Sequence, residues 1–157
     1  MQKITPFLWF DGNAEEATNY YVSIFPDSRI TKVMRCGEAG PGPRGSVLAI
    51  DFELLGQRFS ALNGGSMYTF SPAISFVVNC ETQEEVDRYW ELLLRGGEAL
   101  MCGWLKDRFG LSWQITPTVL PDMLRDEDEE KAGRAMRAMM DMQKLDIAAL
   151  KRAYEGR

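Results

Sequence analysis

The chain has 157 residues, of which 45% are hydrophobic and 26% are charged, and it carries a formal net charge of -5 at pH 7. This length and apolar content predict one globular domain, or two small modules that share a core. The acidic balance argues against a nucleic-acid partner and against an anionic membrane. No apolar run approaches the ~20 residues of a membrane span and the N-terminus shows no signal-peptide pattern, so we expect a cytoplasmic protein.

The sequence contains no histidine and three cysteines, Cys36, Cys80 and Cys102. Without an imidazole, catalytic schemes of the Ser-His-Asp and Cys-His types are excluded, as are histidine-containing zinc sites. The cysteines do not have metal-type spacing, so we expect reduced thiols.

The first part of the chain predicts one strand, one helix and three further strands. Residues 3–10 are rich in Ile, Phe, Leu and Trp, as strands are. Asn13 and Glu16 form a capping-box pattern at the start of a helix over residues 14–25. Three strand-like runs follow, at residues 28–36, 46–55 and 57–63. We interpret the Gly/Pro-rich segment 37–45 as a hairpin loop or, alternatively, as a lid over a cleft.

The second part repeats this plan. A strand is predicted over residues 73–79, and Thr82 with Glu85 forms a second capping box before a helix over residues 83–95. At a constant offset of 69, five residues of the first half map onto similar residues of the second: Phe7, Glu15, Glu16, Tyr20 and Tyr21 onto Phe76, Glu84, Glu85, Tyr89 and Trp90. We interpret this pattern as an internal repeat.

Two short strands end the repeat, at residues 103–106 and 111–116, and a turn at residues 107–110 joins them. We expect Asp107 and Arg108 of this turn to be solvated. In the second strand, alternate residues face opposite ways: Leu111, Trp113 and Ile115 on one side, Ser112, Gln114 and Thr116 on the other. The apolar side predicts a covering helix, and the polar side is typical of a polar-lined cavity or a solvated surface.

Each half therefore reads strand–helix–strand–strand–strand, which predicts an α+β fold of two βαβββ repeats. From residue 118 onward the pattern becomes helical, with a short apolar turn or helix and an acidic run that starts the next helix. Met136, Met139 and Met140 recur at helical spacing in this tail. We expect them to pack on the body of the protein or on a second subunit.

Three segments together carry a resemblance to a known family: Trp9–Ala17, Ala61–Gly65 and Cys102–Trp104. They resemble the PhnB-like subgroup of the vicinal-oxygen-chelate (glyoxalase/bleomycin-resistance/dioxygenase) superfamily, as does a last strand that ends in an inward-facing amide. The resemblance covers nearly the whole chain. It implies one glyoxalase-like domain over residues 1–157, in which two curved mixed sheets surround a cleft and the helices lie outside. Repeat one spans about 1–64, repeat two about 72–117, and a helical extension about 118–157.

In metal-dependent members of the superfamily, the inward faces of the first and last strands of each half supply four ligands. By position, these columns fall near Thr5, near Ala61 or Asn63, near Ala73 or Ser75, and at Gln114. None of these residues is a carboxylate or an imidazole, the donors that a divalent transition metal prefers. We therefore expect no bound metal and no cofactor.

The resemblance also implies a ligand-binding cleft, for which the candidate residues are Thr5, Phe7, Trp9, Asn63, Ser75, Cys102, Trp104 and Gln114. Gln114 would fix a polar group of the ligand, and Asn63 would face it from the other half. Structural roles are the alternatives. Gln114 would then bond a neighbouring strand, Asn63 would form a turn, the two tryptophans would pack in the core, and Cys102 would be a quiet thiol.

Three functional hypotheses follow. The first is a metal-independent protein that binds a small molecule in an apolar, amide-lined cleft and forms a homodimer. The second is a lyase- or isomerase-type enzyme that uses Gln114, Asn63 and a recruited metal or a substrate carboxylate. The third is a structural homodimer whose cleft is filled by its own side chains. Proteins with these motifs are sometimes labelled ubiquinone-pathway methyltransferases, but the sequence has no Gly-x-Gly-x-x-Gly-like strand–turn–helix site for a nucleotide-bearing cofactor.

Overall fold

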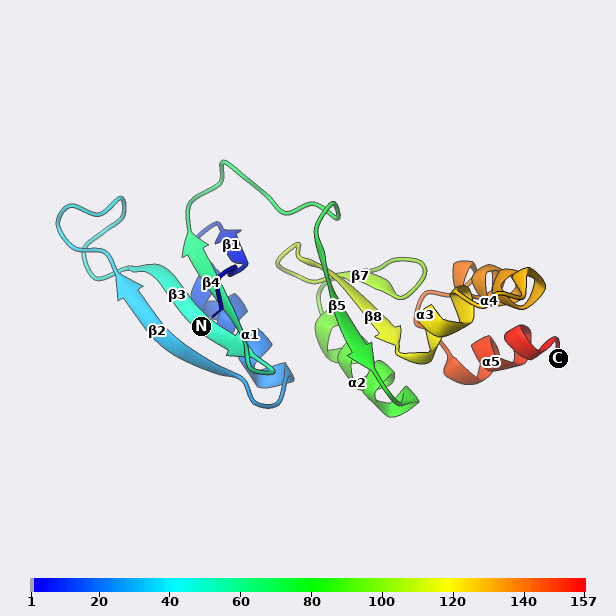
Figure 1. Ribbon diagram of the computed structural model, residues 1–157. Helices are drawn as coiled ribbons and strands as arrows, with labels where there is room; N and C mark the ends of the chain where they lie inside the picture. The colour runs from blue at the N-terminus through cyan, green and yellow to red at the C-terminus, as the bar shows by residue number, and fades with distance from the viewer. Residues whose placement is uncertain (1) are drawn as a thin grey trace. The chain divides into compact units, whose positions relative to one another are not determined.

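The computed structural model describes residues 2–157 and divides the chain into two compact units, Met1–Thr69 and Phe70–Arg157. The boundary falls in the predicted connection between the two repeats, and the C-terminal extension belongs to the second unit. Figure 1 shows the order of the elements along the chain. Among the described residues, no helix is long and apolar enough to cross a membrane.

The first unit is a βαβββ unit, as predicted. Its elements are β1 (Phe7–Phe10), α1 (Ala14–Ile24), β2 (Arg29–Arg35), β3 (Val47–Leu54) and β4 (Gln57–Asn63). The strands form one mixed sheet in the order β1-β4-β3-β2, in which β1 runs parallel to β4 and the other pairs are antiparallel. The segment 37–45 is the connection between β2 and β3, so it is a hairpin loop.

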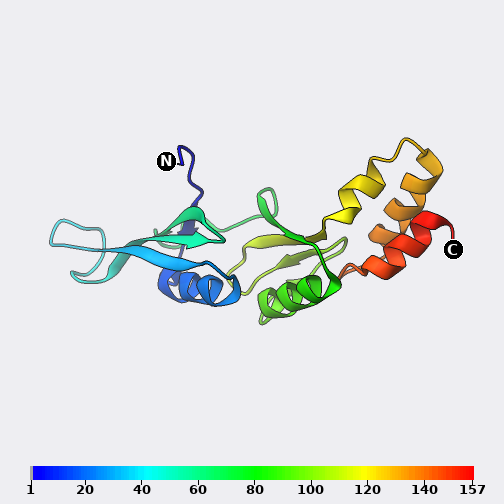
Figure 2. The ribbon, with the colours of Figure 1, turned by 60° about the horizontal axis from the view of Figure 1, so that its bottom comes forward.

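Helix α1 covers one face of this sheet (Figure 2). Tyr21 and Ile24 are buried on the inner side of the helix. The strand residues that face the helix are also buried: Leu8, Phe10, Ile50, Phe52, Leu54, Phe59 and Ala61. Because successive strand residues alternate, the residues between them lie on the opposite face, which α1 does not cover. We call this opposite face the open face of the first sheet.

The second unit begins with the same plan. Its elements are β5 (Ser75–Cys80), α2 (Gln83–Leu94), β6 (Glu98–Ala99), β7 (Trp104–Lys106) and β8 (Ser112–Pro117), with strand order β5-β8-β7-β6. Strand β5 is parallel to β8, and β7 is antiparallel to it. Trp113 and Ile115 are buried together with Val86 and Leu93 of α2, so the predicted covering helix of this strand is α2. The opposite side is the open face of the second sheet.

The helices confirm the register of the repeat, but the strands do not. Both helices fit the offset of 69, since α1 starts at Ala14 and α2 at Gln83. The buried end of β1, however, is Phe10, and the buried end of β5 is Cys80. The strands are therefore offset by one residue more, because Asp11-Gly12-Asn13 is one residue longer than Glu81-Thr82. A slip of one residue changes the face of every side chain, so Phe7 corresponds to Val77 and the predicted match to Phe76 was wrong.

The two helix N-termini are also capped differently. Thr82 caps α2 as predicted, since its side chain accepts a hydrogen bond from Glu85 N at 3.2 Å. At α1, the side chain of Asn13 makes no capping bond. Instead, Asn63 Oδ1 at the end of β4 accepts a hydrogen bond from Ala14 N at 2.9 Å. The predicted Asn13 cap is thus replaced by an amide from a neighbouring strand.

The turn between β7 and β8 differs from the prediction of a solvated pair. Asp107 is only 2% exposed. Its Oδ1 accepts hydrogen bonds from Phe109 N and Leu111 N, and its Oδ2 accepts one from Trp113 Nε1 at 2.9 Å. A carboxylate that accepts three hydrogen bonds can be buried without an unsatisfied charge. Asp107 therefore anchors the turn to the core under α2.

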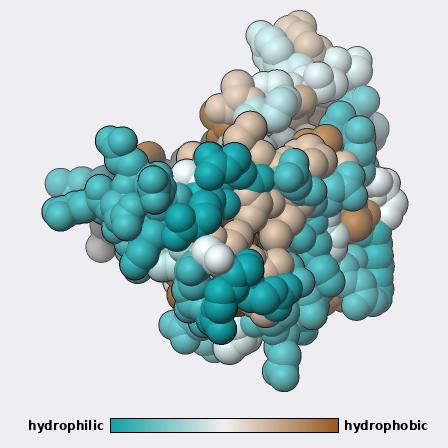
Figure 3. Space-filling view, turned by 90° about the vertical axis from the view of Figure 1, so that its right-hand side faces the viewer, coloured by the Kyte–Doolittle hydropathy of each residue, from teal (hydrophilic) through white to brown (hydrophobic). Residues whose placement is uncertain are grey.

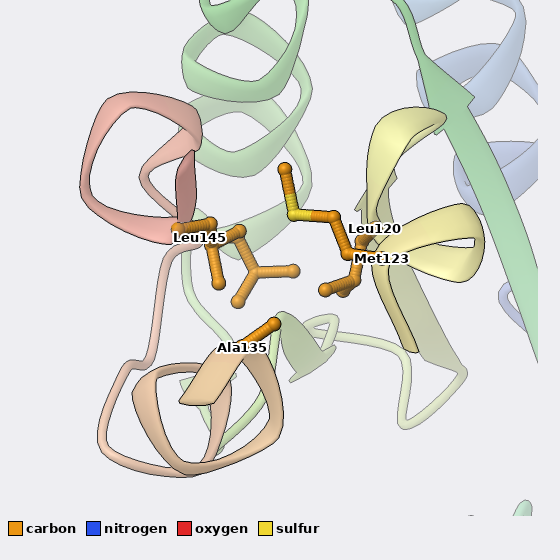
Figure 4. Close-up of a cluster of buried hydrophobic side chains, with 5 residues drawn as sticks. Leu120, Met123, Ala135 and Leu145 are labelled. Carbon is orange, nitrogen blue, oxygen red and sulfur yellow. The ribbon is translucent and has the colours of Figure 1, made fainter. Parts of the chain in front are cut away.

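The extension forms three helices: α3 (Val119–Leu124), α4 (Glu129–Met140) and α5 (Ile147–Glu155). They enclose a small core of Leu120, Met123, Ala135, Leu145 and Leu150, whose side chains converge in Figure 4. Of the three methionines at helical spacing, Met139 packs against this core, while Met136 and Met140 are exposed. Figure 3 shows that the surface on the side of the extension is mainly hydrophilic, with hydrophobic residues in limited patches.

Candidate functional site

The open face of the second sheet carries a polar pair on its two parallel strands. Gln114 on β8 and Ser75 on β5 both lie on this face, and Gln114 Nε2 donates a hydrogen bond to Ser75 Oγ at 2.9 Å. Trp104 of β7 lies beside Gln114, to which it is paired in the sheet. All three are half-buried. The sheet register therefore brings three of the predicted site residues next to one another.

A cavity of about 330 Å³ lies over this part of the sheet. One side is lined by residues from the sheet and the loop before it: Cys102, Trp104, Gln114 and Thr116. The other side comes from the extension: Leu120, Pro121, Leu124, Arg125 and Met139. We call this cavity the extension cavity. Its volume is at the lower end of the range for small-molecule sites.

Two consecutive residues with left-handed backbone shape one wall of the extension cavity. Cys102 has φ of 63° and Gly103 has φ of 82°. Their amides bind the extension: Cys102 N donates to Met142 O at 2.7 Å, and Gly103 N donates to Gln143 O at 2.8 Å. These two bonds hold Cys102 in a conformation that is unfavourable for a residue with a Cβ. The thiol is thereby fixed at the edge of the cavity.

Glycine is required at position 103 for a second reason. A Cβ there would approach Leu145 Cδ1 to 2.8 Å and the Ile115 carbonyl oxygen to 2.9 Å. The Cys-Gly-Trp motif, by which the sequence resembles its family, is thus the point where this chain docks its extension.

The chemistry of the extension cavity is mostly apolar, with a few polar groups. Gln114 and Thr116 supply an amide and a hydroxyl, and Trp104 supplies an aromatic surface. Arg125 is exposed and is the charged residue of the lining, which includes no carboxylate. Cys102 is the one thiol in it, and the other two cysteines of the chain are buried elsewhere. This set can bind and orient a molecule, but it provides no carboxylate or imidazole for acid–base catalysis.

In the first unit, Trp9 lies on the open face but is already packed. Its Nε1 donates to Gly65 O at 2.8 Å, and its ring meets Tyr68 edge to face with centroids 5.0 Å apart. The indole also rests on Gly64, where a Cβ would lie 2.4 Å from Trp9 Cε2. The close approach of the indole explains why a glycine stands at position 64, and these contacts fit the alternative in which Trp9 has a packing role.

Thr5 and Phe7 are not among the residues that line the extension cavity. Thr5 contributes to a separate cavity of about 370 Å³ over the open face of the first sheet, together with Asp51, Ser60 and a cluster of charged residues. Phe7 is 61% exposed. Because β1 and β5 are offset by 70 residues, Thr5 corresponds to Ser75. In the sheet register, Ser60 of β4 is paired with Phe7 of β1, and Gln114 of β8 is paired with Val77 of β5. Ser60 therefore corresponds to Gln114.

Asn63 lies on the opposite face of the first sheet from Trp9. It has the same parity along β4 as the buried Ala61, and its amide caps α1 and donates to Val47 O at 3.0 Å. The prediction that Asn63 and Trp9 line one cleft is corrected, because their side chains lie on opposite faces of the sheet. Asn63 instead borders a third cavity, of about 590 Å³, beneath the β2–β3 loop.

The donor set does not fit the metal site that the superfamily implies. Gln114 Nε2 donates to Ser75 Oγ, and Asn63 uses its amide within the first unit. Among residues 2–157, no group of three or more His, Cys, Asp or Glu side chains is placed to hold a metal ion. Hydroxyls and amides alone are poor ligands for divalent transition metals.

Sequence reasoning missed the residues that the extension contributes. Thr116 continues the alternation of Ser112 and Gln114, so its side of the strand was predicted, although it was not named as a site residue. Leu120, Leu124 and Met139 follow a helical pattern that predicts packing. Helical spacing alone does not reveal that these side chains also border a cavity.

Comparisons with known proteins agree with this architecture. A structure described as a putative 3-demethylubiquinone-9 3-methyltransferase, PhnB protein, from Bacillus cereus is 43% identical, with a TM-score of 0.69, and the match covers 74% of this chain and 100% of that one. A structure of a Pseudomonas aeruginosa protein is 20% identical, covers 74% of this chain and 98% of its own, and has a TM-score of 0.62. The genomically encoded fosfomycin resistance protein FosX from Listeria monocytogenes is 14% identical, covers 78% and 97%, and has a TM-score of 0.54. No curated protein matches this sequence.

The paired βαβββ units define a vicinal-oxygen-chelate fold, as the sequence predicted. A family model described as 3-demethylubiquinone-9 3-methyltransferase matches residues 2–116. The chain belongs to this PhnB-like family.

Proposed function

We propose that this protein binds a small molecule in the extension cavity of the second unit. The observation that carries the proposal is the convergence of Cys102, Trp104 and Gln114 on one cavity of about 330 Å³. The sequence singled out these residues from two segments of the chain. A cavity with an aromatic wall and a few converging polar groups is the usual form of a small-molecule site.

Gln114 is the residue that would orient the ligand. Its Nε2 is bonded to Ser75 Oγ, which fixes the amide plane. The carbonyl oxygen of the same amide remains available as an acceptor for a ligand hydroxyl or N–H. Trp104 would provide the surface against which the body of the ligand packs.

We infer that binding is independent of a metal ion, because the residues of the superfamily's ligand columns are hydroxyls and amides. Elemental analysis of the purified protein should then give substoichiometric zinc, nickel, manganese and iron. One tightly held metal ion per chain would contradict this inference.

The methyl transfer in the family's description would require S-adenosylmethionine, and the residues do not fit it. A parallel strand leads into α1 and another into α2, where an anionic group of a cofactor could bind at the helix N-terminus. The N-termini are occupied by the caps from Asn63 and Thr82, and each first turn carries two glutamates. We therefore expect no heat of binding on titration with S-adenosylmethionine, whereas micromolar affinity would refute this expectation.

We also propose a homodimer. On the first unit, Phe7, Val33 and Met34 of the two edge strands are exposed, and exposed apolar surface is typical of interfaces. Light scattering at tens of micromolar protein should give the mass of two chains. A monomeric mass at that concentration would contradict the proposal.

The binding function can be tested with the neutral fluorescent probe N-phenyl-1-naphthylamine, whose emission rises in apolar sites. The protein should bind the probe saturably at one molecule per chain. Trp104→Ala should abolish this binding, and Trp9→Phe is the matched control because Trp9 lies in the other unit. Equal binding by the wild type and Trp104→Ala would overturn the proposed site.

A further inference from the structure

The C-terminal extension lies outside the part of the chain that defines the family. The family match ends at residue 116, and the Bacillus cereus structure is covered completely by 74% of this chain. Helices α3, α4 and α5 all begin after that point. The extension is thus an addition of this chain to the matched family region.

The extension is attached to the second unit by specific contacts. Besides the backbone bonds from Cys102 and Gly103, Gln83 of α2 holds it from the other side. Its Nε2 donates to Leu145 O at 3.0 Å, and its Oε1 accepts from Ile147 N at 2.8 Å. Lys144 also pairs with Asp87 of α2 at 2.9 Å. Because these contacts flank the buried Leu145, the extension has a defined position on its unit.

The extension has internal supports as well. The side chain of Arg134 on α4 donates to the carbonyl oxygens of Ala153 and Tyr154 on α5, at 2.9 and 2.8 Å. The hydroxyl of Tyr154 donates to Asp126, next to α3. These bonds tie the three helices together around the core in Figure 4, so the side chains they present to the cavity are held in place.

We propose that the extension makes this site selective for amphipathic anions, that is, molecules with an apolar body and one negatively charged end. Leu120, Leu124 and Met139 form an apolar wall opposite Trp104 and Gln114. Arg125, directly after α3, places a guanidinium at the rim, and the lining has no carboxylate to neutralise it. A lone cation in a lining otherwise free of charge favours an anion over a cation.

The positive rim is notable because the chain as a whole carries a net charge of -5. The general field of the protein would therefore repel an anion, and attraction depends on the local guanidinium. This inference rests on the proposed function, in which residues of the second sheet bind a ligand. It assigns the selection of that ligand to residues after position 116, where the family match ends.

The test compares two probes that share an aromatic body. 8-Anilinonaphthalene-1-sulfonate is an amphipathic anion, and N-phenyl-1-naphthylamine is the same body without the sulfonate. In Leu124→Asp the full-length chain should bind both probes about tenfold more weakly or worse, because apolar contact is replaced by a carboxylate. Met136→Asp, a change at an exposed methionine of α4, should leave both affinities unchanged.

The charge is tested separately. Arg125→Gln should weaken binding of the sulfonate by about twofold to fivefold, the range of an exposed ion pair, and should leave the neutral probe unaffected. Arg152→Gln on α5 removes an equal charge away from the cavity and should change neither. An equal effect of Arg125→Gln on both probes, or none on either, would overturn selection for an anion.

The outcomes separate this inference from the proposed function. If Trp104→Ala abolishes binding while Leu124→Asp does not change it, the sheet-side site stands and the role of the extension is refuted. If neither variant has an effect, both are refuted. Circular dichroism and the thermal midpoint verify folding, and Leu124→Ser provides a milder change at the same half-buried position should Leu124→Asp unfold.

Discussion

The two open faces place different chemistry at corresponding positions. In the first unit, Ser60 Oγ donates to Asp51 Oδ1 at 2.7 Å in a cavity that also contains charged residues of β2, β3 and β4. In the second unit, the corresponding neighbours in the sheet are Gln114 and Trp104. There an amide and an indole replace a hydroxyl and a carboxylate.

What covers each face also differs. In the first unit, the tryptophan of the open face is packed on the chain itself, since Trp9 lies on Gly64 and bonds Gly65. In the second unit, residues of α3 and α4 line a cavity together with Trp104. One backbone plan therefore produces a charged, self-satisfied face and a mainly apolar one that shares a cavity with the extension. Side-chain content and a covering segment, rather than topology, decide which face can bind a ligand.

The comparison can be tested first through two aspartates. Asp107→Ala removes the acceptor of three hydrogen bonds in the second unit, two of them buried, so we expect a loss of about 3–5 kcal/mol in the free energy of unfolding. Asp51→Ala on the open face of the first unit should cost about 1 kcal/mol or less, because Asp51 is exposed. Urea unfolding of both variants measures the difference, and equal costs would contradict it.

A second test concerns the self-packed tryptophan. Gly64→Ala would force a Cβ into the ring of Trp9 and should destabilise the protein by about 1–3 kcal/mol, as overpacking does. Gly37→Ala is the matched control, since a Cβ at that position meets nothing within 4 Å, and it should change stability by about 0.5 kcal/mol or less. If Gly64→Ala is as stable as Gly37→Ala, Trp9 is not held by this contact.

A third test compares the polar pairs of the two open faces. A double-mutant cycle on Ser75→Ala and Gln114→Leu should give a coupling energy of about 0.5–1.5 kcal/mol, because the pair is half-buried and directly bonded. The cycle on Asp51→Ala and Ser60→Ala should give about 0.5 kcal/mol or less, since its hydrogen bond is exposed. A coupling of zero between Ser75 and Gln114 would remove the proposed orientation of the Gln114 amide.

A fourth test applies only in alkali and involves the covered face of the second sheet. Burial, with a further contribution from Glu85, raises the pKa of the Cys80 thiol from 9.0 to about 12. Since the unfolded chain ionises this thiol at lower pH than the folded chain, the contribution of Cys80 to stability is complete below pH 9 and is lost as the pH rises toward 12. Cys80→Ala should therefore show a shallower decline of the urea midpoint than the wild type between these values. Parallel declines would show that Cys80 ionises equally in both states.

Much of the fold was predictable because it depends on short-range patterns. The alternation of Trp113 with Gln114 placed α2 on one face of β8 and polar groups on the other, as the structure shows. The Thr82 cap was predicted from a side chain and a backbone amide three residues apart. Such signals lie within one turn of helix or one strand, where the local sequence determines the geometry.

The sequence by itself determined the two βαβββ units, the helix-covered faces and the sheet side of the candidate site, because periodicity and capping act locally. Only the tertiary structure decided the roles of two residues. Asn63 caps α1, which is distant from it in the sequence, and Asp107 is buried among its hydrogen-bond donors. The same holds for the extension cavity, which exists because Gly103 lets Leu145 approach and α3 and α4 contribute side chains to the same lining as Trp104 and Gln114. These features depend on contacts between distant residues, and no local pattern encodes such contacts.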